Sequence, residues 1–296
     1  MITRRSLFKS LAVGSVAAAV PVATLIAQAE EHFEKLALKG DIRQSVSRWC
    51  FQSIPLDALC TICKNFGMVG IDLINENEWD TVNKHDLIVT MSNGPDQIGH
   101  GFNRIEHHDG LVERFERLIP IAAEKKVPNI ICFSGNRRGV RDGQEWEISD
   151  EQGLENCTIG IKRLMPIAEK HGITIYMELL NSLRDHHHYQ ADKTPWGAEL
   201  VGRVGSERFK LLYDIYHMQI MEGNMIDNIR RYKDTIGHYH TAGVPGRRDL
   251  DDQQEIYYPA VIRAIKETGY KGFVAHEFIP KDGIQSLREA VKICDV

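Results

Sequence analysis

Residues 210–219 read KLLYDIYHMQ, an apolar run that leads into Asp214 and, three residues later, His217. A strand inside a parallel sheet is covered on both faces, so its sequence is continuously hydrophobic rather than alternating. The run therefore predicts a buried parallel strand with Asp214 at its carboxyl end and His217 one short step beyond.

Seven further runs of this kind lie along the chain, and helical patterns separate them. They are RQSVSRWCF near residue 46, VGIDLI near 71, DLIVTM near 88, NIICFS near 131, ITIYMEL near 176, IGHYHTA near 239 and GFVAHEF near 275. Apolar residues at helical spacing predict helices over 111–126, 151–171, 225–235, 259–268 and 284–293. Because no glycine-rich phosphate loop opens a helix, we predict an α/β fold of one (β/α)8 TIM barrel over residues 41–296 rather than a doubly wound sheet.

Three other predicted strands also end in residue types that bind metals. Glu178 lies in YMELLN, His240 in GHYHTAG and Glu277 in VAHEF. With Asp214, these residues are separated by 36, 26 and 37 positions, and each spacing suits one βα unit. Active sites of such barrels lie at the carboxyl ends of the strands, so we expect the four side chains to converge.

A buried cluster of three carboxylates and one imidazole needs a compensating cation, because an uncompensated buried carboxylate is energetically costly. Oxygen-rich ligation suits Mg2+, Mn2+ or Co2+, and less specifically Zn2+. The sequence thus predicts one divalent metal ion bound by Glu178, Asp214, His240 and Glu277. A solvated or helix-capping role is the alternative for any single acidic residue at a strand end.

The first 29 residues predict an export leader that is not part of the fold. Arg4 and Arg5 precede an alanine-rich apolar run that ends in AQA at 27–29, a small-residue cleavage signal. The stretch TRRSLFK resembles the twin-arginine export motif, so we expect a cleavable signal peptide over residues 1–29 and a periplasmic or otherwise exported protein. Pro21 and the low content of Leu and Ile argue against an uncleaved membrane anchor. We therefore expect no stable membrane span after cleavage.

The net charge argues against one class of partner, and the cysteines argue against a disulfide-stabilised fold. The formal net charge is −5, and residues 1–29 hold three basic residues and no acid, so the remainder carries −8. An acidic body argues against nucleic acid as a partner. The six cysteines are too few and too scattered for a disulfide framework. Cys60 and Cys63, in a predicted amphipathic helix, are expected to be buried, inert thiols.

The stretches DIYHMQIMEGN (214–224) and HYHTAGVPGRRDL (238–250) resemble the xylose-isomerase-like barrel superfamily, and within it the hydroxypyruvate isomerase family. The ME of YMELLN and the HE of VAHEF belong to the same resemblance, which spans roughly residues 42 to 293. It implies the four metal ligands named above, with Glu178 and Glu277 also acting as the catalytic acid/base pair. It further implies that His217 contacts a substrate oxygen and that Arg247 does likewise or holds a carboxylate.

The implied reaction is proton transfer between adjacent carbons of an α-hydroxy carbonyl compound, through an enediolate that the metal stabilises. Hydroxypyruvate would give tartronate semialdehyde, and a ketose would give its C3 epimer or the aldose. His240 is more similar to the ketose 3-epimerases, since close hydroxypyruvate isomerases often carry Gln there. The alternatives are therefore a ketose 3-epimerase or other sugar isomerase and, in another class, a non-catalytic periplasmic sugar-binding barrel. An endonuclease-IV-like phosphodiesterase on the same barrel needs more histidine ligands and a basic face.

Further residues near the predicted mouth of the barrel are candidates for substrate binding. We expect His188, in the His186–His188 run, and His108 to contact a small-molecule keto acid or sugar, with a solvated loop as the alternative. The arginines at 137, 138 and 141 would suit an acidic group on the substrate, or lie on the surface. Trp49 and Phe51 would form an apolar wall or pack in the core. The sequence is compatible with a homo-oligomer and does not determine the oligomeric state.

Overall fold

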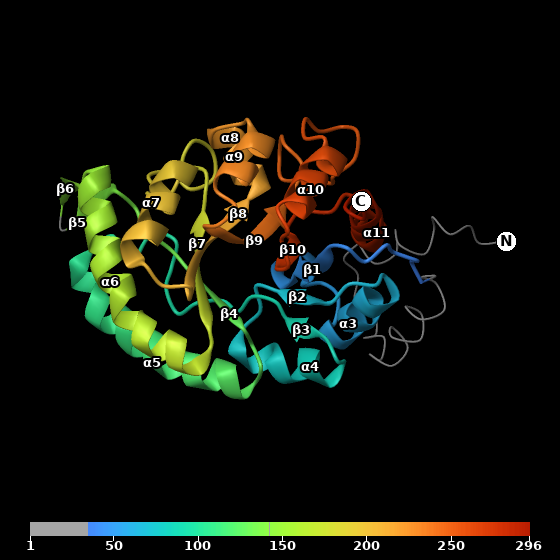
Figure 1. Cartoon of the computed structure of the whole chain (residues 1–296), viewed down its shortest axis with the longest axis horizontal. Coiled ribbons are helices and arrows are strands. Elements are labelled where there is room, and N and C mark those ends of the chain that lie inside the picture. The colour runs from blue at the N-terminus through green and yellow to red at the C-terminus, as the bar shows by residue number, and fades with distance from the viewer. Residues whose placement is uncertain (1–34, 142) are drawn as a thin grey trace.

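The computed structural model describes residues 35–141 and 143–296, so the leader expected over residues 1–29 lies outside the described residues. Eight parallel strands form one sheet around the centre of the molecule (Figure 1). Along the chain they are β1 (Arg43–Ser47), β2 (Gly70–Asp72), β3 (Ile88–Val89), β4 (Asn129–Cys132), β7 (Thr174–Leu179), β8 (Phe209–Asp214), β9 (Ile236–Thr241) and β10 (Phe273–His276). Each coincides with one of the eight predicted runs, which confirms the predicted α/β fold.

The sheet closes on itself. Its hydrogen-bonded order is β3-β2-β1-β10-β9-β8-β7-β4, so the two ends of the series are β3 and β4. Ser92, just after β3, forms a parallel bridge with Ile130 of β4, with hydrogen bonds from Ser92 N to Asn129 O (2.9 Å) and from Ile131 N to Ser92 O (3.0 Å). The eight strands therefore make the barrel that their alternation with helices predicts.

Helices cover the outside of this barrel (Figure 1). The α-helices are α3 (Leu56–Asn65), α4 (Trp79–Lys84), α5 (His108–Glu124), α6 (Asp150–His171), α7 (Thr194–Val204), α8 (Ile215–Met221), α9 (Met225–Arg231), α10 (Tyr258–Glu267) and α11 (Gly283–Ile293). Short 3-10 turns are η1 (Arg48–Phe51), η2 (Glu76–Glu78) and η3 (Ile105–His107). Each strand is thus followed by at least one helix before the next strand of the barrel begins.

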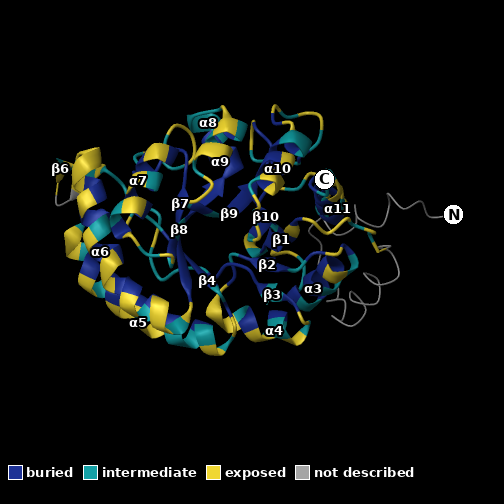
Figure 2. Cartoon of the chain, viewed as in Figure 1, coloured by how far each residue is buried: buried dark blue, intermediate teal, exposed yellow. Residues whose placement is uncertain are grey.

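Two apolar regions hold the barrel together, and Figure 2 shows the strands buried between helices whose outer faces are exposed. The larger region lies between strands and helices and includes Cys60 and Cys63 of α3, both free thiols at 0% exposure, as expected for buried cysteines. The smaller cluster joins Ile131, Tyr176 and Leu212 from three strands with Met91, which lies two residues after β3. Tyr176 and Leu212 lie two residues before Glu178 and Asp214, and side chains two apart share a face of a strand. The smaller cluster therefore forms a floor beneath the predicted ligands.

A hairpin that was not predicted follows β4. Strands β5 (Arg138–Arg141) and β6 (Gln144–Glu147) pair antiparallel and lie apart from the barrel sheet. The guanidinium of Arg104 lies 3.9 Å from the ring centre of Trp146, which fixes the hairpin to the loop before α5. The hairpin occupies the segment whose arginines were considered as ligands of an acidic substrate.

Both ends of α6 are capped. Ser149 caps α6 by accepting a hydrogen bond from Gln152 N (3.1 Å), and Gly172 ends it with φ of 71°. Within residues 35–141 and 143–296, no helix is long and apolar enough to cross a membrane.

Candidate metal centre

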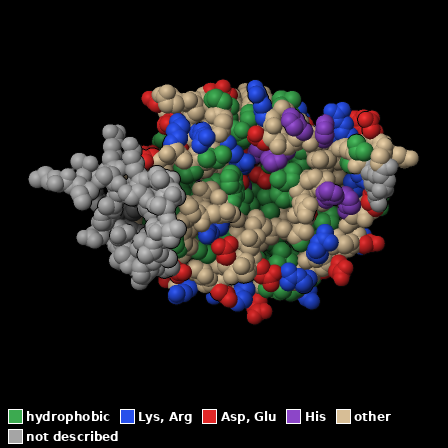
Figure 3. Space-filling view, turned by 180° about the vertical axis from the view of Figure 1, so that it is seen from behind, with side chains coloured by type: hydrophobic (Ala, Val, Ile, Leu, Met, Phe, Trp, Pro, Cys, Tyr) green, Lys and Arg blue, Asp and Glu red, His purple; other side chains and the backbone are tan. Residues whose placement is uncertain are grey.

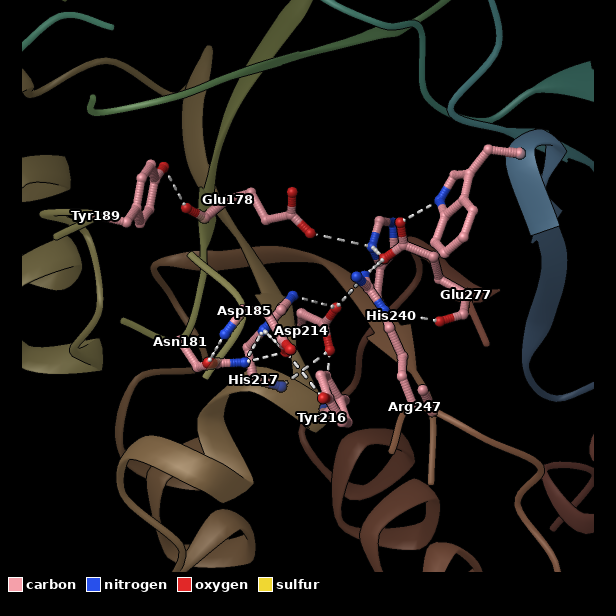
Figure 4. A network of polar contacts seen from close by, with 12 residues as sticks. Glu178, Asn181, Asp185, Tyr189, Asp214, Tyr216, His217, His240, Arg247 and Glu277 are labelled. Atoms are coloured by element: carbon pink, nitrogen blue, oxygen red, sulfur yellow. Dashed lines mark hydrogen bonds and ion pairs between the residues drawn. The ribbon is translucent and has the colours of Figure 1, made fainter. Parts of the chain in front are cut away.

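The four predicted metal ligands converge at the carboxyl ends of four neighbouring strands. Glu178 lies in β7, Asp214 ends β8, His240 lies in β9 and Glu277 directly follows β10. The sheet register places Asp214 opposite His240, and it pairs His276 with Thr241, so Glu277 continues the same rim. In Figure 4 the side chains of Glu178 and Glu277 both point toward His240.

The distances within this cluster are those of a site for one ion. One potential ligand atom from each of the four residues lies within 4.8 Å of the others, and all four residues are buried. His240 Nδ1 lies 2.8 Å from Glu277 Oε2 and 3.4 Å from Glu178 Oε1. In the face shown in Figure 3, acidic side chains are visible in a central depression bordered by hydrophobic and histidine side chains.

A buried aspartate that the sequence analysis did not single out orients His240. Asp72, at the end of β2, places Oδ1 3.0 Å from His240 Nε2, and its Oδ2 accepts a hydrogen bond from Thr90 Oγ1 (2.6 Å) and lies 3.1 Å from His238 Nε2. A metal-binding histidine commonly donates its second ring N–H to a carboxylate, which fixes the ring and the tautomer. With Nε2 engaged by Asp72, His240 presents Nδ1 to the three other ligands.

Glu277 is held by two donors besides His240. The indole Nε1 of Trp49 donates to Glu277 Oε1 (2.6 Å), and Arg247 donates through one guanidinium nitrogen to Glu277 Oε2 (2.6 Å). The same nitrogen lies 3.3 Å from Asp214 Oδ2, so Arg247 contacts two of the three carboxylates. Arg247 has a φ of 55°, a backbone conformation that costs energy for a residue with a side chain and that is often found at functional sites.

Burial and neighbouring charges shift the protonation of the cluster in opposite directions. Burial raises the pKa of Glu178, and it raises the pKa of Asp214 to about 7 against the opposing charge of Arg247. Burial acts in the same sense on Glu277, but the charges of Arg247 and His240 outweigh it and hold the pKa of Glu277 well below its usual range. Burial disfavours a charged His240, yet Glu277 and the hydrogen bond to Asp72 raise the pKa of His240 well above its usual value.

The residues present fit a divalent cation. Glu178 Oε1 is buried and makes no hydrogen bond within the described part of the chain, which is costly for a carboxylate oxygen unless a cation compensates it. Three carboxylates and one oriented imidazole are ligands that suit Mg2+, Mn2+, Co2+ or Zn2+. The cluster is therefore of the kind that holds a divalent metal ion.

His217 lies beside the cluster as a neutral hydrogen-bond donor. Asn181 Oδ1 accepts from the backbone N–H groups of Arg184 and Asp185 (3.0 Å each), so its amide nitrogen faces His217 Nδ1 at 2.6 Å. The proton of the His217 ring is thus on Nε2, which is buried 3.5 Å from Asp214 Oδ2 without a hydrogen bond among the described residues. Burial, and then the charge of Arg247, lowers the pKa of His217 well below its usual value. An uncommitted N–H therefore lies next to the metal ligands.

The structure does not bring the other two predicted substrate-binding histidines to the cluster. His188 accepts a hydrogen bond from Arg138 Nε (2.9 Å) of the β5–β6 hairpin. His108 is buried at the start of α5, where its Nε2 lies 2.8 Å from Phe102 O. Of the His186–His188 run, His186 lies nearest the cluster, with its ring centre 5.3 Å from that of His217. The run follows β7, but its turn aims the first histidine, and not the third, at the site.

The two aromatic residues that follow β1, Trp49 and Phe51, lie in different environments. Phe51 packs in the core with 2% of its surface exposed, whereas Trp49 is 37% exposed and donates to Glu277. The two residues therefore do not form one apolar wall, since Phe51 lies in the core and Trp49 lies at the cluster.

The fold and the cluster agree with known protein families. The model of the xylose isomerase-like TIM barrel family matches residues 77–294, so the chain belongs to this family. Over 174 residues it is 31% identical to the hydroxypyruvate isomerase of Escherichia coli K12, which covers 51% of this chain and 67% of the relative. It is 33% identical over 116 residues to the 2-oxo-tetronate isomerase of Cupriavidus necator, covering 39% and 44%. The chain spans about half the length of the curated vertebrate relatives that it matches.

Solved structures show the same fold. A family 2 AP endonuclease from Brucella melitensis has a TM-score of 0.74 at 20% identity, covering 83% of this chain and 96% of that one. The 3-keto-D-glucoside 4-epimerase of E. coli has a TM-score of 0.69 at 18% identity, covering 85% and 98%. The IolI protein with a bound zinc atom has a TM-score of 0.62 at 16% identity, covering 86% and 95%. At these identities the likeness concerns the barrel itself.

Proposed function

We propose that this protein is a divalent-metal-dependent isomerase that moves a proton between adjacent carbons of an α-hydroxy carbonyl compound. The observation that carries the proposal is the cluster of Glu178, Asp214, His240 and Glu277, buried together at the carboxyl ends of four neighbouring strands. The names of two relatives, hydroxypyruvate isomerase and 2-oxo-tetronate isomerase, indicate substrates of this chemical class. A metal ion in this cluster would polarise the carbonyl and hydroxyl oxygens of the substrate and lower the pKa of its carbon-bound proton.

The side chains of the cluster divide the remaining work. Glu178 and Glu277 come from different strand ends and both contact His240 Nδ1, so one carboxylate is available to remove the proton and the other to return it. Glu178, which has one oxygen without a hydrogen bond, is the freer base, whereas Trp49 and Arg247 hold Glu277 in one orientation. The free Nε2–H of His217 is placed to donate to a substrate oxygen.

The identity of the product depends on the carbon that receives the proton. Return to the neighbouring carbon gives an aldose–ketose isomer, or tartronate semialdehyde from hydroxypyruvate. Return to the same carbon from the opposite face gives an epimer, the outcome of the ketose 3-epimerase alternative. Two carboxylates that reach one site from different strand ends accommodate both outcomes. The substrate is a small molecule in either case, and the charge of −8 outside residues 1–29 gives no reason to propose a nucleic acid.

Metal analysis combined with solvent-deuterium exchange tests this proposal. The purified protein is incubated in D2O with hydroxypyruvate and a panel of ketoses, and its metal content is measured in parallel. We expect one divalent ion per chain and deuterium in the product, with exchange lost in Glu178→Gln and Glu277→Gln. Asp96→Asn, which changes a buried carboxyl outside the cluster, is the matched control and should keep the exchange. A protein without metal and without exchange on any substrate would leave the sugar-binding alternative.

We also propose that the protein is exported through the twin-arginine route and loses residues 1–29. The support is the sequence alone, namely Arg4 and Arg5 followed by an apolar run and a small-residue cleavage signal. Replacing both arginines by lysine should retain the full-length chain in the cytoplasm, as measured by fractionation and N-terminal sequencing. Unchanged export of the double variant would refute this route.

A further inference from the structure

A polar pocket lies beside the metal centre, at the ends of strands that contribute no metal ligand. It has a volume of about 350 Å³, within the range of small-molecule sites (roughly 300–1,000 Å3). Its walls come from the segments that follow β1, β2 and β3 at the carboxyl end of the barrel. The lining residues used below are Arg48, Trp49, Gln52, Asn75, Glu78 and Asn93.

Trp49 connects this pocket with the metal centre. Its indole N–H donates to Glu277 Oε1 at 2.6 Å, while the residue lines the pocket and keeps 37% of its surface exposed. The pocket therefore begins within the width of one indole from a residue of the acid/base pair. A substrate whose reacting carbons lie at Glu277 would extend past Trp49 into the pocket.

The charges that line the pocket cancel each other. Arg48 Nε lies 3.1 Å from Glu78 Oε1, and the guanidinium also donates to the backbone oxygens of Phe51 (2.9 Å) and Ile54 (3.3 Å). The remaining polar lining residues named above are amides, which carry no charge. Because Glu78 balances the charge of the guanidinium, and three of its five N–H groups are already engaged, the pocket has no net charge to attract a carboxylate or a phosphate.

The amides give the pocket both donors and acceptors for hydroxyl groups. Asn93 Nδ2 donates to Asn75 Oδ1 (2.8 Å), which fixes these two amides relative to each other and leaves Asn93 Oδ1 and Asn75 Nδ2 for a ligand. Gln52 is exposed, and its amide makes no hydrogen bond within the described residues. A sugar hydroxyl both donates and accepts, so paired amides beside an exposed aromatic ring suit a sugar.

We infer that this pocket is a subsite for a neutral sugar ring, so that the substrate is a glycosylated ketose rather than a three-carbon keto acid. The inference rests on the proposed function for the reacting part of the substrate. It assigns recognition of the distal part to Trp49 and the amides of Gln52, Asn75 and Asn93.

Binding measured by calorimetry tests the subsite without any turnover. The probes are methyl α-D-glucopyranoside, which has the anomeric configuration of the glucosyl group in isomaltulose, and the methyl α-glycoside of D-glucuronate, which has the same ring and one negative charge. We expect the metal-loaded protein to bind the neutral glucoside more tightly than the acid. The double variant Gln52→Ala/Asn93→Ala should weaken glucoside binding about tenfold or more, as the loss of two hydrogen bonds implies. Gln97→Ala, an exposed amide in a loop outside this pocket, should bind as the wild type does.

Turnover then separates the subsite from the proposed function. D-fructose and its glucosyl derivative isomaltulose present the same ketose with and without a sugar ring. We expect kcat/KM to be at least tenfold higher for isomaltulose, and the double variant to lose this advantage while D-fructose turnover changes less than twofold. Equal kcat/KM for the two ketoses, or tighter binding of glucuronate than of the glucoside, overturns the subsite and leaves the isomerase proposal intact. Glucoside binding without deuterium exchange on any substrate would support the subsite and overturn the isomerase proposal.

Discussion

Replacing Asp72 by asparagine should weaken metal binding by the cluster of Glu178, Asp214, His240 and Glu277, although Asp72 is not a member of that cluster. Asp72 is fully buried and contacts His240 Nε2 at 3.0 Å, on the side of the ring that faces away from the metal ligands. Asparagine has the same shape but no charge, and its amide can present either an acceptor or a donor to the ring. The variant therefore keeps the packing and removes the charge that fixes the orientation and basicity of His240.

The expected magnitude follows from the type of contact. Loss of a carboxylate that orients a metal-bound histidine typically costs about 10–100-fold in metal affinity, which corresponds to about 1.4–2.8 kcal/mol. Asp72 also accepts from Thr90 and lies 3.1 Å from His238 Nε2, so its replacement disturbs two histidines and belongs in the upper part of this range. Removal of a direct ligand, as in Glu178→Gln, should cost more.

Competition between the metal-free protein and a chromogenic chelator, with Mn2+ or Co2+, measures this effect. Asp96→Asn makes the same chemical change at a buried carboxyl outside the cluster and serves as the matched control. Circular dichroism checks that both variants fold. If folded Asp72→Asn binds the metal as tightly as wild type and Asp96→Asn do, the orientation of His240 by Asp72 is not what prepares the site.

Three further predictions concern protons and metal. Metal affinity should rise with pH through about 7, because the ligands must release protons to bind the ion. The pKa of Asp214 is raised to about 7, and the pKa values of Glu178 and His240 are also raised. Titration calorimetry in two buffers counts the protons released, and no release would contradict the assigned ligands. Chelation with EDTA should lower the Tm by about 5–10 °C relative to protein with metal at 100 times its Kd, since such binding adds about 2.7 kcal/mol; an unchanged scanning-calorimetry Tm argues against a bound ion. Burial raises the pKa of Asp96 to about 8, so the folded state keeps a proton that the unfolded state loses near pH 4. The free energy of unfolding should therefore fall as pH rises from about 4 to 8. Asp96→Asn should abolish this fall in urea titrations at saturating metal, and the same pH dependence in wild type and variant would refute the prediction.

The barrel could be predicted from the sequence because buried parallel strands leave a direct signal. Each strand is an apolar run of β-forming residues, and a polar residue such as Asp214 is conspicuous at its end. Spacing then assigns Glu178, His240 and Glu277 to the same rim, since one βα unit separates neighbouring strand ends. The four ligands converge in the structure as this reasoning requires.

The rest of the site could not be predicted because its contacts depend on side-chain direction and on loops. Asp72 interrupts the apolar run VGIDLI as Asp214 interrupts its own run, so a signal was present, but its partner His240 is 168 residues away. Trp49 and Phe51 are two residues apart after one strand, and only the turn η1 decides which of them faces the site. The Asp142-Gly143 dipeptide between short alternating runs is typical of a hairpin and would have predicted β5 and β6. In the His186–His188 run, the loop after β7 determined which histidine approached the cluster.

The four proposed metal ligands lie at the ends of β7 to β10, whereas the pocket beside Trp49 is made by the segments after β1 to β3. The proposed catalytic cluster and the proposed subsite thus occupy different arcs of the barrel rim, which meet where β1 pairs with β10. A barrel arranged in this way is modular for protein engineering. We expect that loops after the first three strands can be exchanged to accept new substituents, provided that Trp49, which donates to Glu277, is kept.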